Sequence, residues 1–109
     1  MKYALLVCHD EEAITRTDEQ RVAAFNAFSA RMGDRLLGYA RLRPTSTATT
    51  VRVRGGDVVI ADGPFAETKE QVAGFFIVEC ADLDEAVEAA ASIPTAAYGA
   101  VEVRPLWEL

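Results

Sequence analysis

The sequence has few of the residues on which most covalent and metal chemistry depends. It contains one histidine, His9, and two cysteines, Cys8 and Cys80. Because the cysteines form neither a CxxC pair nor a cysteine-rich framework, we expect them to be buried free thiols. The chain also lacks a glycine-rich phosphate loop, a GxSxG motif and a Cys/His nucleophile spacing. We therefore expect no cofactor.

Basic residues and long apolar runs are also scarce. Eleven Lys and Arg residues stand against 17 Asp and Glu residues, so the formal net charge is -6. This charge disfavours direct DNA or RNA binding, which rests on Lys and Arg neutralising phosphates. The apolar run MKYALLVC is too short for a membrane span or a signal-peptide core. We expect a cytoplasmic protein that does not enter a membrane.

The composition is that of a soluble globular protein, with 50% hydrophobic and 26% charged residues. A chain of 109 residues predicts a single domain, residues 1–109. So small a domain gains from oligomerisation, which hides further apolar surface.

Apolar patterns along the chain predict six strands and two helices. Thr17 and Gln20 form a capping-box pattern that begins the first helix, and Gly33 ends it. Asp82 begins the second helix, which Pro94 ends. The expected elements are strands at 2–8, 36–43, 51–54, 57–61, 72–80 and 98–107, and helices at 18–32 and between 82 and 94.

This order, β-α-β, hairpin, β-α-β, predicts an α+β, ferredoxin-like fold with an inserted β-hairpin. The antiparallel sheet would have the order fourth, first, third, second strand, counted without the hairpin, with both helices on one face. Residues 2–8 are apolar on both alternating sets of side chains, so the other face also needs a cover. We expect a homodimer through that face, of the dimeric α/β-barrel type.

The predicted topology brings the ends of several elements to one rim. His9, Arg43, residues 62–69 and Tyr98 all follow or precede strands at that end. His9 is the natural general acid/base, since imidazole titrates near neutral pH. Asp62 would hold and orient the ring. The alternative is that His9 is a hydrogen-bonded structural group.

The stretch ADGPFAETKE, residues 61–70, has two interpretations. Gly63 and Pro64 are typical of a rigid turn, in which Phe65 would plug the core. Alternatively the loop forms a pocket wall, with Phe65 as apolar surface and Asp62 as the polar contact.

Four arginines, Arg41, Arg43, Arg52 and Arg54, alternate along strands, which usually indicates a solvated face. By position, Arg43 could instead bind an anionic substrate. The run of four residues from His9 to Glu12 does not predict a metal site, because adjacent strand side chains point in opposite directions.

Several long blocks resemble one protein family. The blocks MKYALLVCHDEEA, ADGPFAETKEQVAGFFIVEC, DLDEAVEAAASIP and VEVRPLW are similar to YCII-related proteins of the branch named for its Asp-Gly-Pro-Phe (DGPF) motif. The resemblance implies a dimeric ferredoxin-like fold. In the wider group a His/Asp pair in a cleft has been taken as an acid/base site, and some members are small lyases or dehalogenases. Their histidine lies in the first helix, and residues 18–32 here contain none.

Two functions follow as hypotheses. The first is a dimer that binds a small molecule in a pocket lined by His9, Arg43, Asp62, Phe65 and Tyr98, with a cofactor-free, lyase-like acid/base activity in its enzymatic form. The second is a non-enzymatic regulatory or accessory protein. It follows from the resemblance, because members of the DGPF branch are often encoded near, or fused to, extracytoplasmic-function sigma factors.

Overall fold

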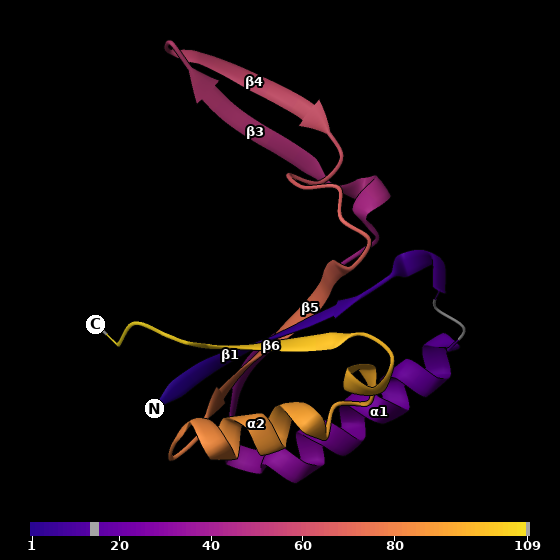
Figure 1. Cartoon of the computed structure of the whole chain (residues 1–109), viewed down its shortest axis with the longest axis vertical. Coiled ribbons are helices and arrows are strands. Elements are labelled where there is room, and N and C mark those ends of the chain that lie inside the picture. The colour runs from indigo at the N-terminus through magenta and orange to yellow at the C-terminus, as the bar shows by residue number, and fades with distance from the viewer. Residues whose placement is uncertain (14–15, 109) are drawn as a thin grey trace.

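A computed structural model describes residues 1–13 and 16–108 (Figure 1). Every predicted strand and helix is present, together with short 3-10 helices between them. The strands and long helices are β1 (Lys2–His9), α1 (Asp18–Met32), β2 (Leu36–Arg41), β3 (Thr49–Arg54), β4 (Asp57–Asp62), β5 (Gln71–Glu79), α2 (Leu83–Ala91) and β6 (Ala100–Pro105). The 3-10 helices are η1 (Glu11–Ala13), η2 (Gly33–Arg35), η3 (Thr45–Thr47) and η4 (Pro94–Ala97).

Four strands form an antiparallel sheet in the order β2-β5-β1-β6. Leu5, at the centre of β1, lies opposite Phe76 of β5 on one side and Val103 of β6 on the other. This is the order predicted from the sequence, and it confirms the α+β, ferredoxin-like fold. The apolar strand β1 is central, with a neighbouring strand on each edge and the helices on one face.

Both helices pack on one face of this sheet (Figure 1). The core between the layers contains Tyr3, Leu5 and Val78, all at most 1% exposed. From α1 only Phe28 and Met32 are buried, and both lie in its C-terminal half. The N-terminal half of α1 therefore borders the sheet without filling the space beneath it.

The ends of α1 follow the predicted capping chemistry. The Thr17 hydroxyl accepts a hydrogen bond from the Gln20 backbone N–H, and the Gln20 side chain accepts one from the Thr17 N–H. Gly33 ends the helix at a φ of 55°, which is strained for residues with a side chain. The capping box satisfies the backbone N–H groups of Thr17 and Gln20. The local sequence therefore determines where α1 begins.

No helix of residues 1–13 and 16–108 covers the second face of the sheet. Across an antiparallel ladder, opposite residues share a face, so Ala4 lies beside Ile77 and Leu6 beside Phe75 on this side. We call Ala4, Leu6, Phe75 and Ile77 the open face. Its apolar character matches the predicted need for a cover.

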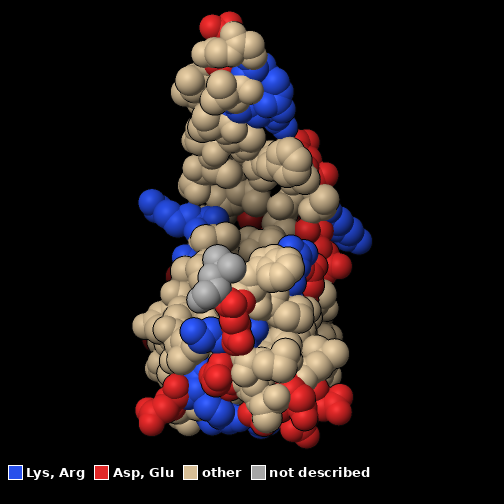
Figure 2. Space-filling model, turned by 90° about the vertical axis from the view of Figure 1, so that its left-hand side faces the viewer, with Lys and Arg blue, Asp and Glu red and all other residues tan. Residues whose placement is uncertain are grey.

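Strands β3 and β4 form a separate two-stranded sheet that projects from the body as an arm (Figure 1). Gly55 and Gly56 form its tip, both with positive φ. One face of the arm carries four exposed apolar side chains, Val51, Val53, Val58 and Ile60. In space-filling view the arm is mostly neither acidic nor basic, apart from basic side chains on one side and acidic ones near the tip (Figure 2).

The remaining differences from the predicted elements are at strand ends. The last strand begins at Ala100 rather than at residue 98, because Pro94 starts a 3-10 helix whose hydrogen bonds extend to Gly99. Strand β2 ends two residues earlier than expected, at Arg41. Among the described residues, no helix is both long enough and apolar enough to cross a membrane.

Candidate functional site

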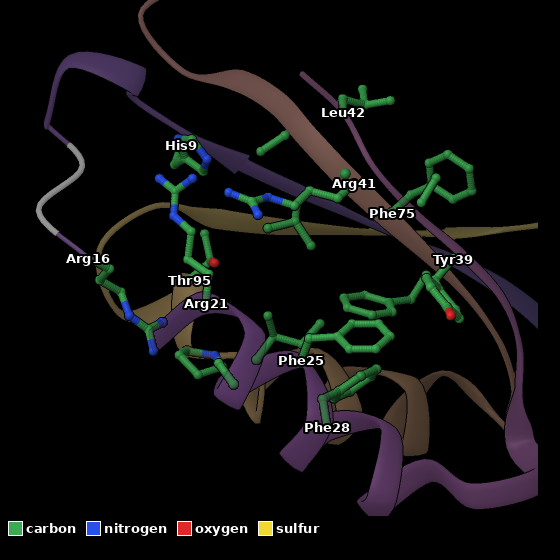
Figure 3. Close-up of a pocket in the computed structure, with 18 of the residues that line it drawn as sticks. His9, Arg16, Arg21, Phe25, Phe28, Tyr39, Arg41, Leu42, Phe75 and Thr95 are labelled. Carbon is green, nitrogen blue, oxygen red and sulfur yellow. The ribbon is translucent and has the colours of Figure 1, made fainter. Parts of the chain in front are cut away.

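A pocket of about 680 Å³ lies between the N-terminal half of α1 and the β2 side of the sheet (Figure 3). This volume suits a small organic ligand. The pocket exists because α1 buries side chains only from its second half. Its walls come from β1, β2, β5, α1 and the η4 region, and include His9, Glu11, Arg16, Arg21, Phe25, Phe28, Tyr39, Arg41, Arg43, Phe76, Thr95 and Tyr98.

One end of the pocket is aromatic. The ring of Phe25 lies 4.6 Å from that of Tyr39 and 5.9 Å from that of Phe76, measured between centroids. Phe28 packs beneath them at 4.5 Å from Phe76. Phe28 is buried, whereas Tyr39 is 59% exposed, so this cluster runs from the core to the pocket mouth. It offers an apolar, aromatic surface to a ligand.

His9 lies at the other end and is 9% exposed. Its Nδ1 atom is buried and has no hydrogen-bond partner within the described chain. Burial lowers the pKa of His9, and the positive charge of Arg21 lowers it further, against weaker opposing effects of Asp10 and Glu11. The neutral imidazole is therefore favoured near pH 7, with a nitrogen free to accept or donate a proton.

Arginines gather around His9. Arg21 extends from α1 and Arg41 from β2, and both reach toward the histidine (Figure 3). Arg41 is paired with Asp18 at 3.0 Å. Within residues 1–13 and 16–108, no carboxylate lies within ion-pair distance of Arg21. The Arg21 guanidinium is thus a partly buried cation without a counter-charge in contact.

Tyr98 completes this end of the pocket from the segment after η4. Burial acts to raise its pKa, but polar interactions with Thr95 and Arg16 and the charge of Arg21 outweigh it, so the pKa is lowered. Gly99 positions the segment, because a Cβ there would clash with the backbone carbonyl oxygen of Cys8. Glycine at this position lets the chain pass directly beside the end of β1.

Glu11 ties the pocket rim to the base of the arm. Its Oε1 atom accepts a hydrogen bond from the Thr45 N–H at 2.9 Å, and its Oε2 atom accepts one from the Thr45 hydroxyl at 2.8 Å. These bonds fix the segment that leaves β2 through Arg43 and Pro44. They also occupy the only carboxylate among the described lining residues.

Three of the five predicted site residues line the pocket: His9, Arg43 and Tyr98. Asp62 and Phe65 do not, so the single chain does not bring them to the pocket as predicted. Asp62 ends β4, opposite Thr49 in the arm. Because the arm pairs with itself and leaves the sheet, Asp62 forms no hydrogen bond with the His9 Nδ1 atom.

Phe65 does not plug the core either. It is 80% exposed, and its ring lies 5.4 Å from the guanidinium carbon of Arg52. Gly63, with a φ of 100°, and the hydrogen bond from its N–H to the Ala48 carbonyl form the turn at the arm's base. The turn interpretation of this stretch is therefore correct, without the core contact.

Sequence reasoning missed Arg16, Arg21 and Tyr39 as pocket residues. A signal for Arg21 was present, since Arg21, Phe25 and Phe28 are four and three residues apart and share one helix face. An arginine on the apolar face of a helix is unusual, and it marks the place where that face meets the pocket rather than the core.

The described lining combines a neutral imidazole, a phenol with a lowered pKa, and four arginines against one glutamate. This is a formal excess of three positive charges in a chain whose net charge is -6. Such a set can hold a small anion beside a group that exchanges protons.

Comparison with known proteins identifies the family of the chain. The chain is 40% identical to an uncharacterized protein of Rhizobium meliloti (strain 1021) over 115 residues, which covers 97% of this chain and 92% of that protein. The YCII-related domain matches residues 1–109. The chain therefore belongs to the YCII-related domain family.

Proposed function

We propose that the chain binds a small organic molecule in this pocket and that His9 transfers a proton to or from it. The observation that carries the proposal is the buried Nδ1 atom of His9, which lines the pocket and has no partner among the described residues. A buried polar atom without a hydrogen bond costs free energy. A ligand that bonds to Nδ1 would remove that cost.

The environment of His9 supports a general base. Burial and Arg21 favour the neutral ring, which is the form that accepts a proton. Tyr98, with its lowered pKa, lies in the same pocket and is suited to return a proton. In this proposal Arg43 holds the ligand at the rim, and Asp62 and Phe65 have no part within one chain.

Deuterium exchange tests this activity without knowledge of the full reaction. The protein is incubated in D2O with a panel of small ketones, lactones and organic acids that have exchangeable C–H bonds, and deuterium incorporation is followed by proton NMR. The native protein is expected to accelerate exchange in at least one compound, and His9→Gln to abolish this acceleration. Exchange that is equally fast with His9→Gln would contradict the proposal.

We also propose that two copies associate through the open face. Leu6, Phe75 and Ile77 of this face are only partly buried within the described chain, and a second copy would bury them further. Ile77→Glu should convert a dimer to a monomer in light scattering coupled to gel filtration. Val87→Glu, at an exposed position of α2, is the matched control and should leave the mass unchanged.

A regulatory role is the alternative, and the apolar face of the arm favours it. An isolated two-stranded sheet is marginally stable in water, and Val51, Val53, Val58 and Ile60 are exposed on it. A partner protein would cover them. Under this alternative, we propose that the protein belongs to the DGPF branch, is cytoplasmic and is linked to a sigma factor. Its test is direct binding of a purified sigma factor encoded beside the gene, which Val51→Thr with Ile60→Thr should abolish.

A further inference from the structure

We propose that the pocket takes a small organic acid, with its carboxylate held at Arg21 and its apolar body against Phe25 and Tyr39. The inference rests on the pocket proposed above as the ligand site. It adds the chemical class and the orientation of the ligand. Two separate features of the lining, one charged and one apolar, support it.

The charged feature is Arg21. Its guanidinium points toward the buried His9 (Figure 3), and no carboxylate of the described chain pairs with it. By contrast, Arg41 is paired with Asp18 and Arg35 with Glu85. A partly buried arginine without an acidic partner is stabilised by an anion, and its planar fork of N–H donors fits a carboxylate.

The apolar feature restricts what the anion is attached to. Phe25 of α1, Tyr39 of β2 and Phe76 of β5 form a continuous aromatic wall at the end of the pocket away from His9. A purely inorganic anion would leave this wall in contact with water. A molecule with a ring or a branched chain beside its carboxylate would cover the wall. Apolar surface of both the wall and the ligand would then be removed from water.

The position of the anion also affects His9. The charge of Arg21 is one cause of the lowered pKa of the histidine. A bound carboxylate would neutralise that charge, while Asp10 and Glu11 continue to favour the protonated ring. Ligand binding would therefore raise the pKa of His9 and make the ring a stronger base when substrate is present.

Three probes separate the two features. Benzoate has a charge and a ring, benzamide has nearly the same shape without the charge, and inorganic phosphate has charge without a ring. Because His9 is the only histidine, its imidazole NMR signals report binding without ambiguity. Benzoate should bind about ten- to hundredfold more tightly than benzamide, the range expected for a charged hydrogen-bonded contact. It should also bind more tightly than phosphate.

Arg21→Gln should weaken benzoate binding by a similar factor and leave benzamide binding unchanged. Arg31→Gln is the matched control, since Arg31 is exposed on the same helix and outside the pocket. Equal affinities for benzoate and benzamide, or equal effects of the two variants, would overturn the carboxylate site. Phosphate binding as tight as benzoate would overturn the organic-acid class. Proton transfer by His9 is tested separately by deuterium exchange in the ketones and lactones of the panel, which carry no carboxylate, so either proposal can fail alone.

Discussion

Replacing Phe28 with alanine tests the packing that supports the pocket. Phe28 is 3% exposed and packs between α1 and β5, with its ring 4.5 Å from that of Phe76. Loss of the buried ring costs about 1.5–3 kcal/mol of transfer free energy, and the space left behind raises the total to about 3–5 kcal/mol. Because Phe28 borders the pocket, water can enter that space, and we expect the lower end, about 3 kcal/mol.

The matched control is the same change at Phe65, which is 80% exposed. Phe65→Ala should alter the free energy of unfolding by less than about 0.5 kcal/mol. Urea unfolding followed by far-UV circular dichroism measures both variants. Tryptophan fluorescence is a poor probe, since Trp107 is 92% exposed. Equal destabilisation by the two variants would refute the placement of Phe28 in the core and Phe65 outside it.

Three further predictions follow from local geometry and charge. Gly74→Ala should destabilise the fold by more than about 1 kcal/mol in urea unfolding, because its Cβ would lie 2.6 Å from the Ala40 carbonyl oxygen. Gly38→Ala is the control and should cost less, since its Cβ would make only an ordinary contact with Ile77. Thr17→Ala removes the capping box and should cost about 1 kcal/mol, measured the same way. Because the pKa of His9 is lowered in the folded chain, the unfolded chain binds more protons than the folded chain below about pH 6.5. The free energy of unfolding should therefore fall as the pH is lowered through that range. His9→Gln should reduce this fall.

The fold could be predicted because local chemistry and global order agree. The element order β-α-β, hairpin, β-α-β predicted a sheet in which the first strand is central, and β1 is central. Thr17 with Gln20, and Gly33, predicted the ends of α1. His9, Arg43 and Tyr98 were placed together because the ferredoxin-like order brings the ends of their elements to one edge, and the pocket lining includes all three.

The position of the arm could not be predicted in the same way. Gly63 and Pro64 indicate a turn, but the direction of the chain depends on hydrogen bonds between residues distant in sequence, such as Gly63 N–H to Ala48 and Thr50 Oγ1 to the Gly63 carbonyl. These bonds place Asp62 in the arm rather than beside His9. Turn residues predict that the chain changes direction. They do not predict how far Asp62 lies from His9.

The arginine end of the pocket was hidden for a different reason. In a helix an arginine is usually a solvated residue. The spacing of Arg21, Phe25 and Phe28 places Arg21 on the apolar face of the helix, but it does not show whether that face meets the core or a cavity. That depends on how far the N-terminal half of α1 stands from the sheet, which is set by the burial of Phe28 and Met32 further along the helix. Packing of one half of α1 therefore determines the exposure of the other.

The most direct measurement is the pH titration of the His9 imidazole by NMR, which is unambiguous because the chain has one histidine. In the native protein the pKa should lie below the ordinary value of about 6.5, since burial and Arg21 both lower it. Arg21→Gln, or saturation with benzoate, should raise it. A pKa at or above 6.5 that responds to neither change would contradict a buried, neutral histidine facing an anion-binding pocket.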